Sequence, residues 1–139
     1  MRYLAIDYGD KRSGLAIGDD QTRIASPLQV IGVSDQHRLI SHIKLVLDQH
    51  EVNALVVGLP LNMDGSESEQ SRKVKLLAGQ LERLLEMPVH LVDERLTSAA
   101  ADQRMAGSEL TYQQKKSRRD ALAAAEILSD FFRSLDDQE

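Results

Sequence analysis

The sequence predicts an α/β protein built on a mixed five-stranded sheet flanked by helices. Short apolar runs rich in β-branched residues, which are typical of strands, occur five times along the chain. Polar turns separate the first three runs, which favours antiparallel pairing. The later runs alternate with longer segments of helical periodicity, which is typical of parallel crossovers. We therefore expect the first three strands to be antiparallel and the following ones to be parallel.

Three strands are expected at the start of the chain. Residues 2–8 form a nearly continuous apolar run that is typical of a central strand, and residues 13–18 follow it across the turn at 9–12. A third strand is expected at residues 28–33, directly after Pro27.

The middle of the chain alternates helices with strands. Ser34 can cap a helix at residues 35–50, and the β-branched run at 54–58 is too short for a helix and predicts the fourth strand. Ser66 and Glu69 have the spacing of a capping box for the second helix. The apolar faces of the two helices consist of Leu39, Ile43, Val46, Leu47, His50, Val74, Leu77, Leu81 and Leu84.

The last third of the chain completes one predicted domain, residues 1–135, followed by a polar tail at 136–139. Its elements are expected at residues 89–93 (strand), 98–105 (short helix), 107–119 (mobile polar loop) and 120–135 (helix).

Composition limits the possible functions. The 139 residues carry a formal net charge of −5 and no cysteine, which excludes a disulfide framework and a thiolate zinc site. No signal peptide is visible and no apolar run is long enough to cross a bilayer, so we expect a cytoplasmic protein without membrane contact. The negative charge disfavours generic nucleic-acid binding, although basic residues gather at 11–12, 72–75 and 115–119.

Acidic residues stand at three places where an apolar residue would be usual. Asp7 ends the first strand, Asp93 and Glu94 end the fifth, and Asp120 lies on the apolar stripe of the last helix. An ionised carboxylate removed from water must be paired, protonated or bound to a cation, so the three sites together predict a metal site. For Asp120 alone, stabilisation of the helix dipole explains the acid equally well. Spacing does not decide between Asp93 and Glu94.

Carboxylate oxygens are the ligands that Mg²⁺ or Mn²⁺ prefer, and we expect one or two such ions. Two ions can activate an attacking water and stabilise the leaving oxygen of an in-line displacement. The four histidines lack the spacing of a metal motif and are expected to be ordinary surface or core residues.

Four segments follow one another in the order and at the spacing of a known family. They are DYGDKRSGLA (residues 7–16), VGLP (57–60), VDERLTS (92–98) and DALAAAEIL (120–128). Together they resemble the YqgF family, also called RuvX. The resemblance implies an RNase H-like fold. Members of that family are described as Holliday junction resolvases, by kinship to RuvC, and as nucleases that mature the 5′ end of pre-16S ribosomal RNA.

The resemblance implies catalytic and metal-binding roles for Asp7, Glu94 and Asp120. It selects Glu94 over Asp93, because the glutamate matches the RuvC-type pattern. Ser117 departs from the family, in which glycine is common between the basic residues before the last helix.

Residues close to these acids are expected to bind substrate. Gly9 and Gly14 leave room for a backbone to approach Asp7, although a plain hairpin turn is the better explanation of these glycines alone. The basic run before Asp120 is equally consistent with a phosphate clamp and with a solvated loop. The predicted substrate-binding residues are Gly9, Lys11, Arg12, Arg95, Lys116 and Arg119.

The sequence therefore predicts a divalent-metal-dependent nuclease acting on structured nucleic acid, with a ribosomal RNA precursor as the favoured substrate. The alternatives are a Holliday junction resolvase acting on branched DNA, a binding module without catalysis, and an actin-like nucleotide-binding domain. Actin-like proteins share the opening Asp-x-Gly hairpin but enclose ATP between two domains, whereas one domain is expected here. A monomer and a homodimer are both compatible with the sequence.

Overall fold

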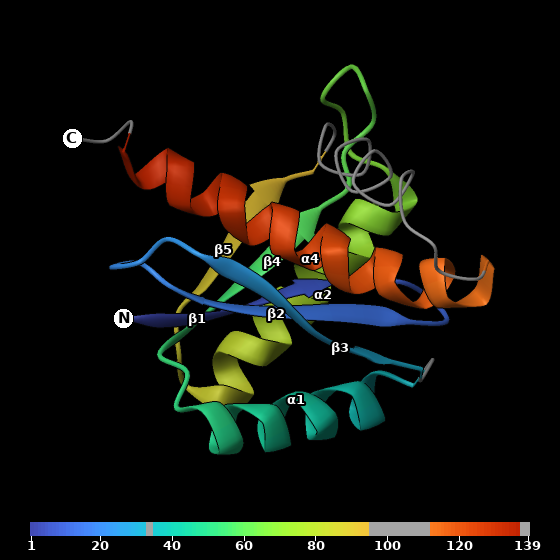
Figure 1. The fold of residues 1–139 in the computed structure, drawn as a ribbon. Coiled ribbons are helices and arrows are strands. Elements are labelled where there is room, and N and C mark those ends of the chain that lie inside the picture. Colours follow the sequence, from blue (N-terminus) through green and yellow to red (C-terminus); the bar gives the residue numbers. More distant parts are fainter. Residues whose placement is uncertain (33–34, 95–111, 137–139) are drawn as a thin grey trace.

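The five strands form one mixed sheet in the order β3-β2-β1-β4-β5 (Figure 1). The computed structural model describes the backbone of residues 1–32, 35–94 and 112–136, and the side chains of these residues except 112–118 and 136. β1 and β3 each pair antiparallel with β2, and β4 pairs parallel with both β1 and β5, which confirms the predicted sheet. The elements are β1 (Arg2–Asp7), β2 (Ser13–Asp19), β3 (Ala25–Ile31), α1 (Gln36–His50), β4 (Ala54–Leu59), α2 (Glu69–Leu85), β5 (Val89–Asp93) and α4 (Tyr112–Asp136).

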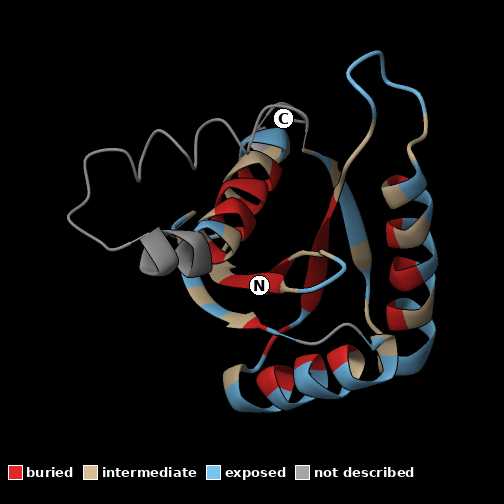
Figure 2. Cartoon of the chain, turned by 90° about the vertical axis from the view of Figure 1, so that its right-hand side faces the viewer, coloured by how far each residue is buried: buried red, intermediate tan, exposed pale blue. Residues whose placement is uncertain are grey.

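Helices cover both faces of this sheet (Figures 1 and 2). Side chains alternate along β1, so Leu4 and Ile6 pack on the side of α1 and α2, whereas Tyr3 and Ala5 pack on the side of α4. Asp7 shares the face of Tyr3 and Ala5 by the same alternation. The first of the three acids therefore lies on the α4 side, at the carboxyl end of β1.

The predicted apolar faces of α1 and α2 form the core on the opposite side of the sheet. The buried positions are Leu39, Ile43, Val46, Leu47, Val74, Leu77 and Leu81, whereas Leu84, near the end of α2, is 66% exposed.

Small residues allow α4 to lie close to the sheet. Ala5, Ala16 and Ala54 on the strands and Ala124 and Ala125 on the helix are all buried in one cluster. Because these side chains are short, the main chain of the helix comes near the sheet surface.

The last helix begins earlier than predicted. α4 starts at Tyr112, so residues 112–119, which we expected to be a mobile loop, are helical. Lysine, arginine and glutamine are good helix formers, and no glycine or proline interrupts the chain after Gly107. The apolar stripe that marks this helix in the sequence begins only after Asp120, so its polar first turns carry no periodic signal. The short helix predicted at residues 98–105 lies outside the described residues.

Two element boundaries differ from the predictions for physical reasons. β3 begins at Ala25, three residues early, and includes Pro27, whose missing N–H is tolerated because β3 is an edge strand. Asp35 caps α1 by accepting a hydrogen bond from the His37 N–H at 2.9 Å, and aspartate is as good an N-cap as serine. The predicted cap, Ser34, lies outside the described residues.

The capping box of α2 lies two residues beyond its predicted place. Ser68 accepts a hydrogen bond from the Ser71 N–H at 2.9 Å, and the Ser71 hydroxyl accepts one from the Ser68 N–H at 2.8 Å. Ser66 instead donates its hydroxyl to Asp64 at 2.6 Å in the preceding loop. None of the described helices combines the length and apolar character that crossing a membrane requires.

Replacing Ser68 with alanine should lower the free energy of unfolding by about 1–2 kcal/mol, because it removes the N-cap of α2. The Ser68 hydroxyl also donates to the Pro60 carbonyl at 2.6 Å, and the substitution removes that bond as well. Ser66→Ala is the matched control: it lies in the exposed loop and should cost about 0.5 kcal/mol or less. Urea denaturation measures the free energy of unfolding of both variants, and an equal loss of stability in the two would contradict the observed cap.

Candidate active site

Three neighbouring strands place one residue each in a row on the face that α4 covers. Asp7 of β1 pairs with Gly14 of β2. On the other side Ile6 pairs with Val57, which puts Gly58 of β4 at the level of Asp7. The acid therefore lies between two residues that have no side chain.

Glu94 reaches this row from the next strand. Val92 packs on the α4 side, so alternation along β5 turns Glu94 to that side and Asp93 away from it. The Glu94 N–H donates to the Leu59 carbonyl at 3.2 Å, and its side chain forms a hydrogen bond with the Asp7 carboxyl. The structure thus brings Glu94, and not Asp93, to Asp7.

The two carboxyl groups hold a proton at neutral pH. Burial raises the pKa of Asp7 from 3.8 to about 8, and the negative charges of Glu94 and Asp120 act in the same direction. Burial also raises the pKa of Glu94; the hydrogen bond from Asp7 lowers it in part, and the charge of Asp93 raises it. Because burial raises the pKa of both groups, the two carboxyl groups share a proton as a pair.

Asp120 joins the group through a different partner. Its Oδ2 accepts a hydrogen bond from Arg12 Nε at 2.9 Å, and the side chains of Arg12 and Asp120 are 39% and 26% exposed. The carboxylate is close enough to Asp7 to raise the pKa of that group. One cation of the β1–β2 turn therefore lies beside the acids and partly offsets their charge.

Gly14 fixes the position of Asp120. A methyl group at residue 14 would overlap the carbonyl oxygen of Asp120 and lie 2.7 Å from the nitrogen of Ala121. The main chain of α4 therefore rests directly on β2 at this point. The sequence indicated that a backbone approaches here, and that backbone belongs to the helix that carries the third acid.

The turn at residues 9–12 is held by its own contacts. The Gly9 N–H donates to the Ser13 hydroxyl at 3.4 Å, and a methyl group at Gly9 would overlap the Arg12 carbonyl oxygen. Asp10 pairs with Lys73 of α2 at 3.3 Å, while Lys11 is exposed. The tight turn accounts for Gly9 without a ligand.

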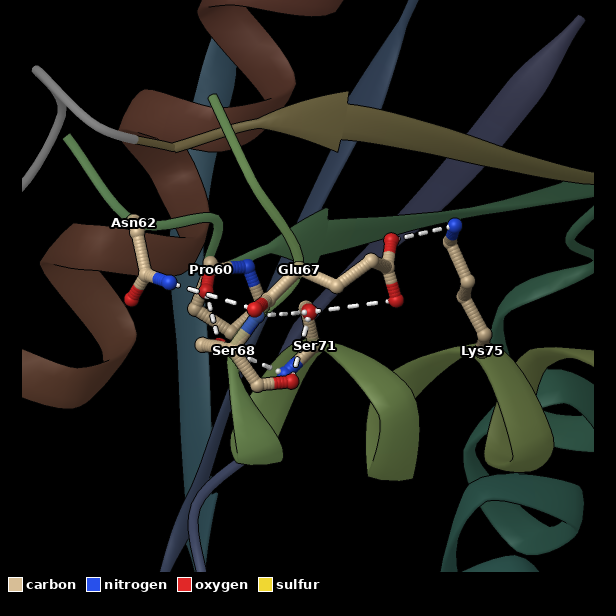
Figure 3. A network of polar contacts seen from close by, with 6 residues as sticks. All are labelled: Pro60, Asn62, Glu67, Ser68, Ser71 and Lys75. Carbon is tan, nitrogen blue, oxygen red and sulfur yellow. Dashed lines mark hydrogen bonds and ion pairs between the residues drawn. The ribbon is translucent and has the colours of Figure 1, made fainter. Parts of the chain in front are cut away.

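The loop after β4 is braced by polar contacts (Figure 3). The Asn62 amide donates to the Glu67 carbonyl at 3.1 Å, and the Ser68 hydroxyl donates to the Pro60 carbonyl. Glu67 also pairs with Lys75 of α2 at 2.5 Å. This loop leaves the same end of the sheet as the acids and is ordered by its own side chains.

The donor set fits a hard divalent cation only in part. Asp7 and Glu94 offer buried oxygen ligands whose mutual repulsion a cation would relieve. Within residues 1–32, 35–94 and 112–136, however, no three acidic or histidine side chains are arranged to hold an ion as they stand. The third acid, Asp120, accepts a hydrogen bond from Arg12 through Oδ2, so that oxygen would have to exchange its partner to bind the ion.

Three predicted substrate-binding residues are only partly placed. Arg95 lies outside the described residues, and Lys116 belongs to the first turns of α4. Arg119 is exposed on the same helix, one residue before Asp120. The sequence did not single out Glu126, a residue of α4 that is only 4% exposed. It also did not assign a role to Gly58, although a glycine inside an apolar strand is a signal that another group approaches closely.

The sequence profile described as "RuvX: Holliday junction resolvase" matches residues 1–134. The chain belongs to the RuvX family. A relative from Anaeromyxobacter sp. (strain Fw109-5) is 42% identical over 92% of this chain and 93% of its own length. Another, from Maridesulfovibrio salexigens, is 38% identical over 92% of this chain and 95% of its own length. Both are named "Putative pre-16S rRNA nuclease".

Solved structures share the fold of this RuvX family member. Thermus thermophilus RuvC superposes with a TM-score of 0.58 at 17% identity, covering 99% of this chain and 97% of that one. The fowlpox virus resolvase, solved with Holliday junction DNA, gives 0.60 at 14% identity over 97% of this chain and 99% of its own. These matches confirm the RNase H-like fold that the sequence predicted.

Asp7→Asn should raise the free energy of unfolding of this RuvX family member at pH 8 by at least about 1 kcal/mol when no divalent ion is present. Folding raises the pKa of Asp7 to about 8, so the wild type loses stability as the pH rises from about 4 to 8, and asparagine removes that loss. The gain should shrink toward pH 4, where Asp7 becomes protonated in the unfolded protein as well.

Denaturant melts at several pH values measure this difference. Asp48→Asn, at an exposed position of α1, is the control and should leave the pH profile unchanged. If the free energy of unfolding changed with pH in the same way for the wild type and Asp7→Asn between pH 4 and 8, Asp7 would not be the group that lowers stability at high pH.

Proposed function

We propose that this protein is a divalent-metal-dependent nuclease that hydrolyses phosphodiester bonds in structured nucleic acid during maturation of the 5′ end of pre-16S ribosomal RNA. The observation that carries the proposal is the buried Asp7–Glu94 pair with Asp120 beside it. Close carboxylates on one edge of a sheet are costly for folding, which supports a role in binding cations. The names of the relatives support the RNA substrate.

Asp7, Glu94 and Asp120 are the residues that would hold Mg²⁺ or Mn²⁺, as one or two ions. Bound ions supply activation of a water and stabilisation of the leaving oxygen. Asp7 and Glu94 would release their shared proton when a cation replaces it, so metal binding should be accompanied by proton release.

Arg12 has two roles in the proposal. It pairs with Asp120 at 2.9 Å, and at 39% exposure it remains accessible to a substrate phosphate. Because guanidinium binds phosphate oxygens well, an incoming phosphodiester can draw Arg12 from Asp120. Both oxygens of Asp120 are then available to a metal ion when the substrate is in place.

The remaining basic residues are proposed to bind the substrate backbone. Lys11 is exposed on the β1–β2 turn, and Arg119 is exposed on α4 next to Asp120. Lys116 lies one turn before Asp120 on the same helix. Lys116 and Arg119 both belong to α4, so their backbone is helical, whereas the sequence predicted a mobile loop.

A DNA junction is the second candidate substrate, because the family is described as a Holliday junction resolvase. The two substrates are distinguished by cleavage of a structured pre-16S RNA fragment and a four-way DNA junction side by side, with and without Mn²⁺. We expect cleavage of the RNA that requires Mn²⁺ and is absent in Asp7→Asn. Cleavage of the junction alone would favour the resolvase, and binding of both without cleavage would favour a binding module.

Lys116→Ala combined with Arg119→Ala should weaken RNA binding and flatten its salt dependence. The slope of log affinity against log salt should fall by about one unit for each phosphate that the variant no longer neutralises. The control combines Arg38→Ala and Lys44→Ala, exposed cations of α1 on the opposite side of the sheet, and should leave the slope unchanged. If both double variants behaved like the wild type, α4 would not contact the RNA.

A further inference from the structure

The hydrogen bond between Asp7 and Glu94 crosses a strand. Asp7 ends β1 and Glu94 directly follows β5, and the sheet order places β4 between these two strands. Adjacent strands lie about 4.8 Å apart, which separates β1 from β5 by roughly 10 Å. The Glu94 side chain covers this distance by passing above β4.

Gly58 is the residue over which it passes. A methyl group at this position would overlap Glu94 Oε2, lie 3.2 Å from Glu94 Cδ and lie 2.5 Å from Ile127 Cδ1. The carboxylate of Glu94 therefore occupies the space that any other residue at position 58 would fill with its side chain.

Backbone conformation does not explain this glycine. Gly58 is a buried residue of β4, and Gly65 is the one glycine with a positive φ among the described residues. Glycine inside a strand costs stability relative to other residues and commonly marks a close approach by another group. The group that approaches here is the Glu94 carboxylate.

We propose that Gly58 is a positioning residue of the active site, whose missing side chain forms the slot that holds the Glu94 carboxylate against Asp7. The inference rests on the proposed metal-dependent nuclease. Gly58 itself contacts neither the substrate nor an ion; it acts through Glu94.

A single methyl group is enough to close the slot. The atoms that a methyl group at Gly58 would meet are side-chain ends, the carboxylate of Glu94 and the Cδ1 of Ile127, which must shift to make room. Gly14 differs, because there a methyl group would meet the main chain of Asp120. Gly58→Ala is therefore the cleaner test.

Gly58→Ala should weaken Mn²⁺ binding, measured by calorimetry, by about ten- to a hundredfold, as is usual when a group that orients a metal ligand is changed. In RNA cleavage kcat should fall, while KM for RNA should change little, because the phosphate-binding residues are untouched. The matched control is Gly79→Ala on α2, where a methyl group would meet nothing within 4 Å. It should leave Mn²⁺ affinity and kcat unchanged.

Two further variants separate positioning from strain in the core. Ile127→Val removes the Cδ1 atom, so Gly58→Ala with Ile127→Val should recover the stability that strain removes but not the Mn²⁺ affinity. Glu94→Gln removes the ligand itself, and adding Gly58→Ala to it should cost little further affinity. Two results would overturn the proposal. One is that Ile127→Val restores Mn²⁺ binding to Gly58→Ala; the other is that the losses of Mn²⁺ affinity caused by Gly58→Ala and Glu94→Gln are fully additive.

The failure of this inference can be told from failure of the proposed function. If the wild type binds Mn²⁺ and cleaves RNA while Gly58→Ala matches it in both, Gly58 has no positioning role and the nuclease stands. If the wild type itself neither binds Mn²⁺ nor cleaves, both proposals fall.

Discussion

The arrangement of this protein depends on bringing two carboxyl groups together on the face of a sheet that a helix covers. Asp7 lies on β1 and Glu94 follows β5, and their hydrogen bond requires β4 to present no side chain between them. Burial and like charge both oppose ionisation, so the pair keeps a proton that an isolated pair in water would lose. Folding thus tolerates an electrostatic cost at this edge of the sheet. Such a cost is typical of a site that exchanges protons for metal ions.

The third acid reaches the pair through the main chain. Small residues beneath α4 let the helix lie close, and Gly14 receives the backbone of Asp120 directly. Arg12 then satisfies the Asp120 carboxylate from the adjacent turn. The two glycines beside Asp7 therefore have different tasks, since Gly14 positions a helix and Gly58 positions a side chain.

The sequence predicted the sheet, its strand directions and the place of Asp7 at the end of the first strand, because strand and helix periodicity follow from burial alone. Polar helix turns carry no such periodicity, which is why a loop was predicted at residues 112–119. The cap of α2 was misplaced because Ser66 and Ser68 are chemically alike, and only the folded loop decides between them. Periodicity placed Asp120 toward the sheet, but its pairing with Arg12 joins residues 108 positions apart, which local pattern does not encode.

The central claim is that Asp7 and Glu94 share a proton until a divalent ion takes its place. The direct measurement is an NMR titration of the Asp7 side-chain carboxyl carbon, with and without saturating Mg²⁺. Without the ion the account predicts a midpoint near pH 8, with the Glu94 carboxyl responding over the same range, and with the ion a midpoint displaced well below neutrality. A midpoint near pH 4 that Mg²⁺ does not move would contradict it.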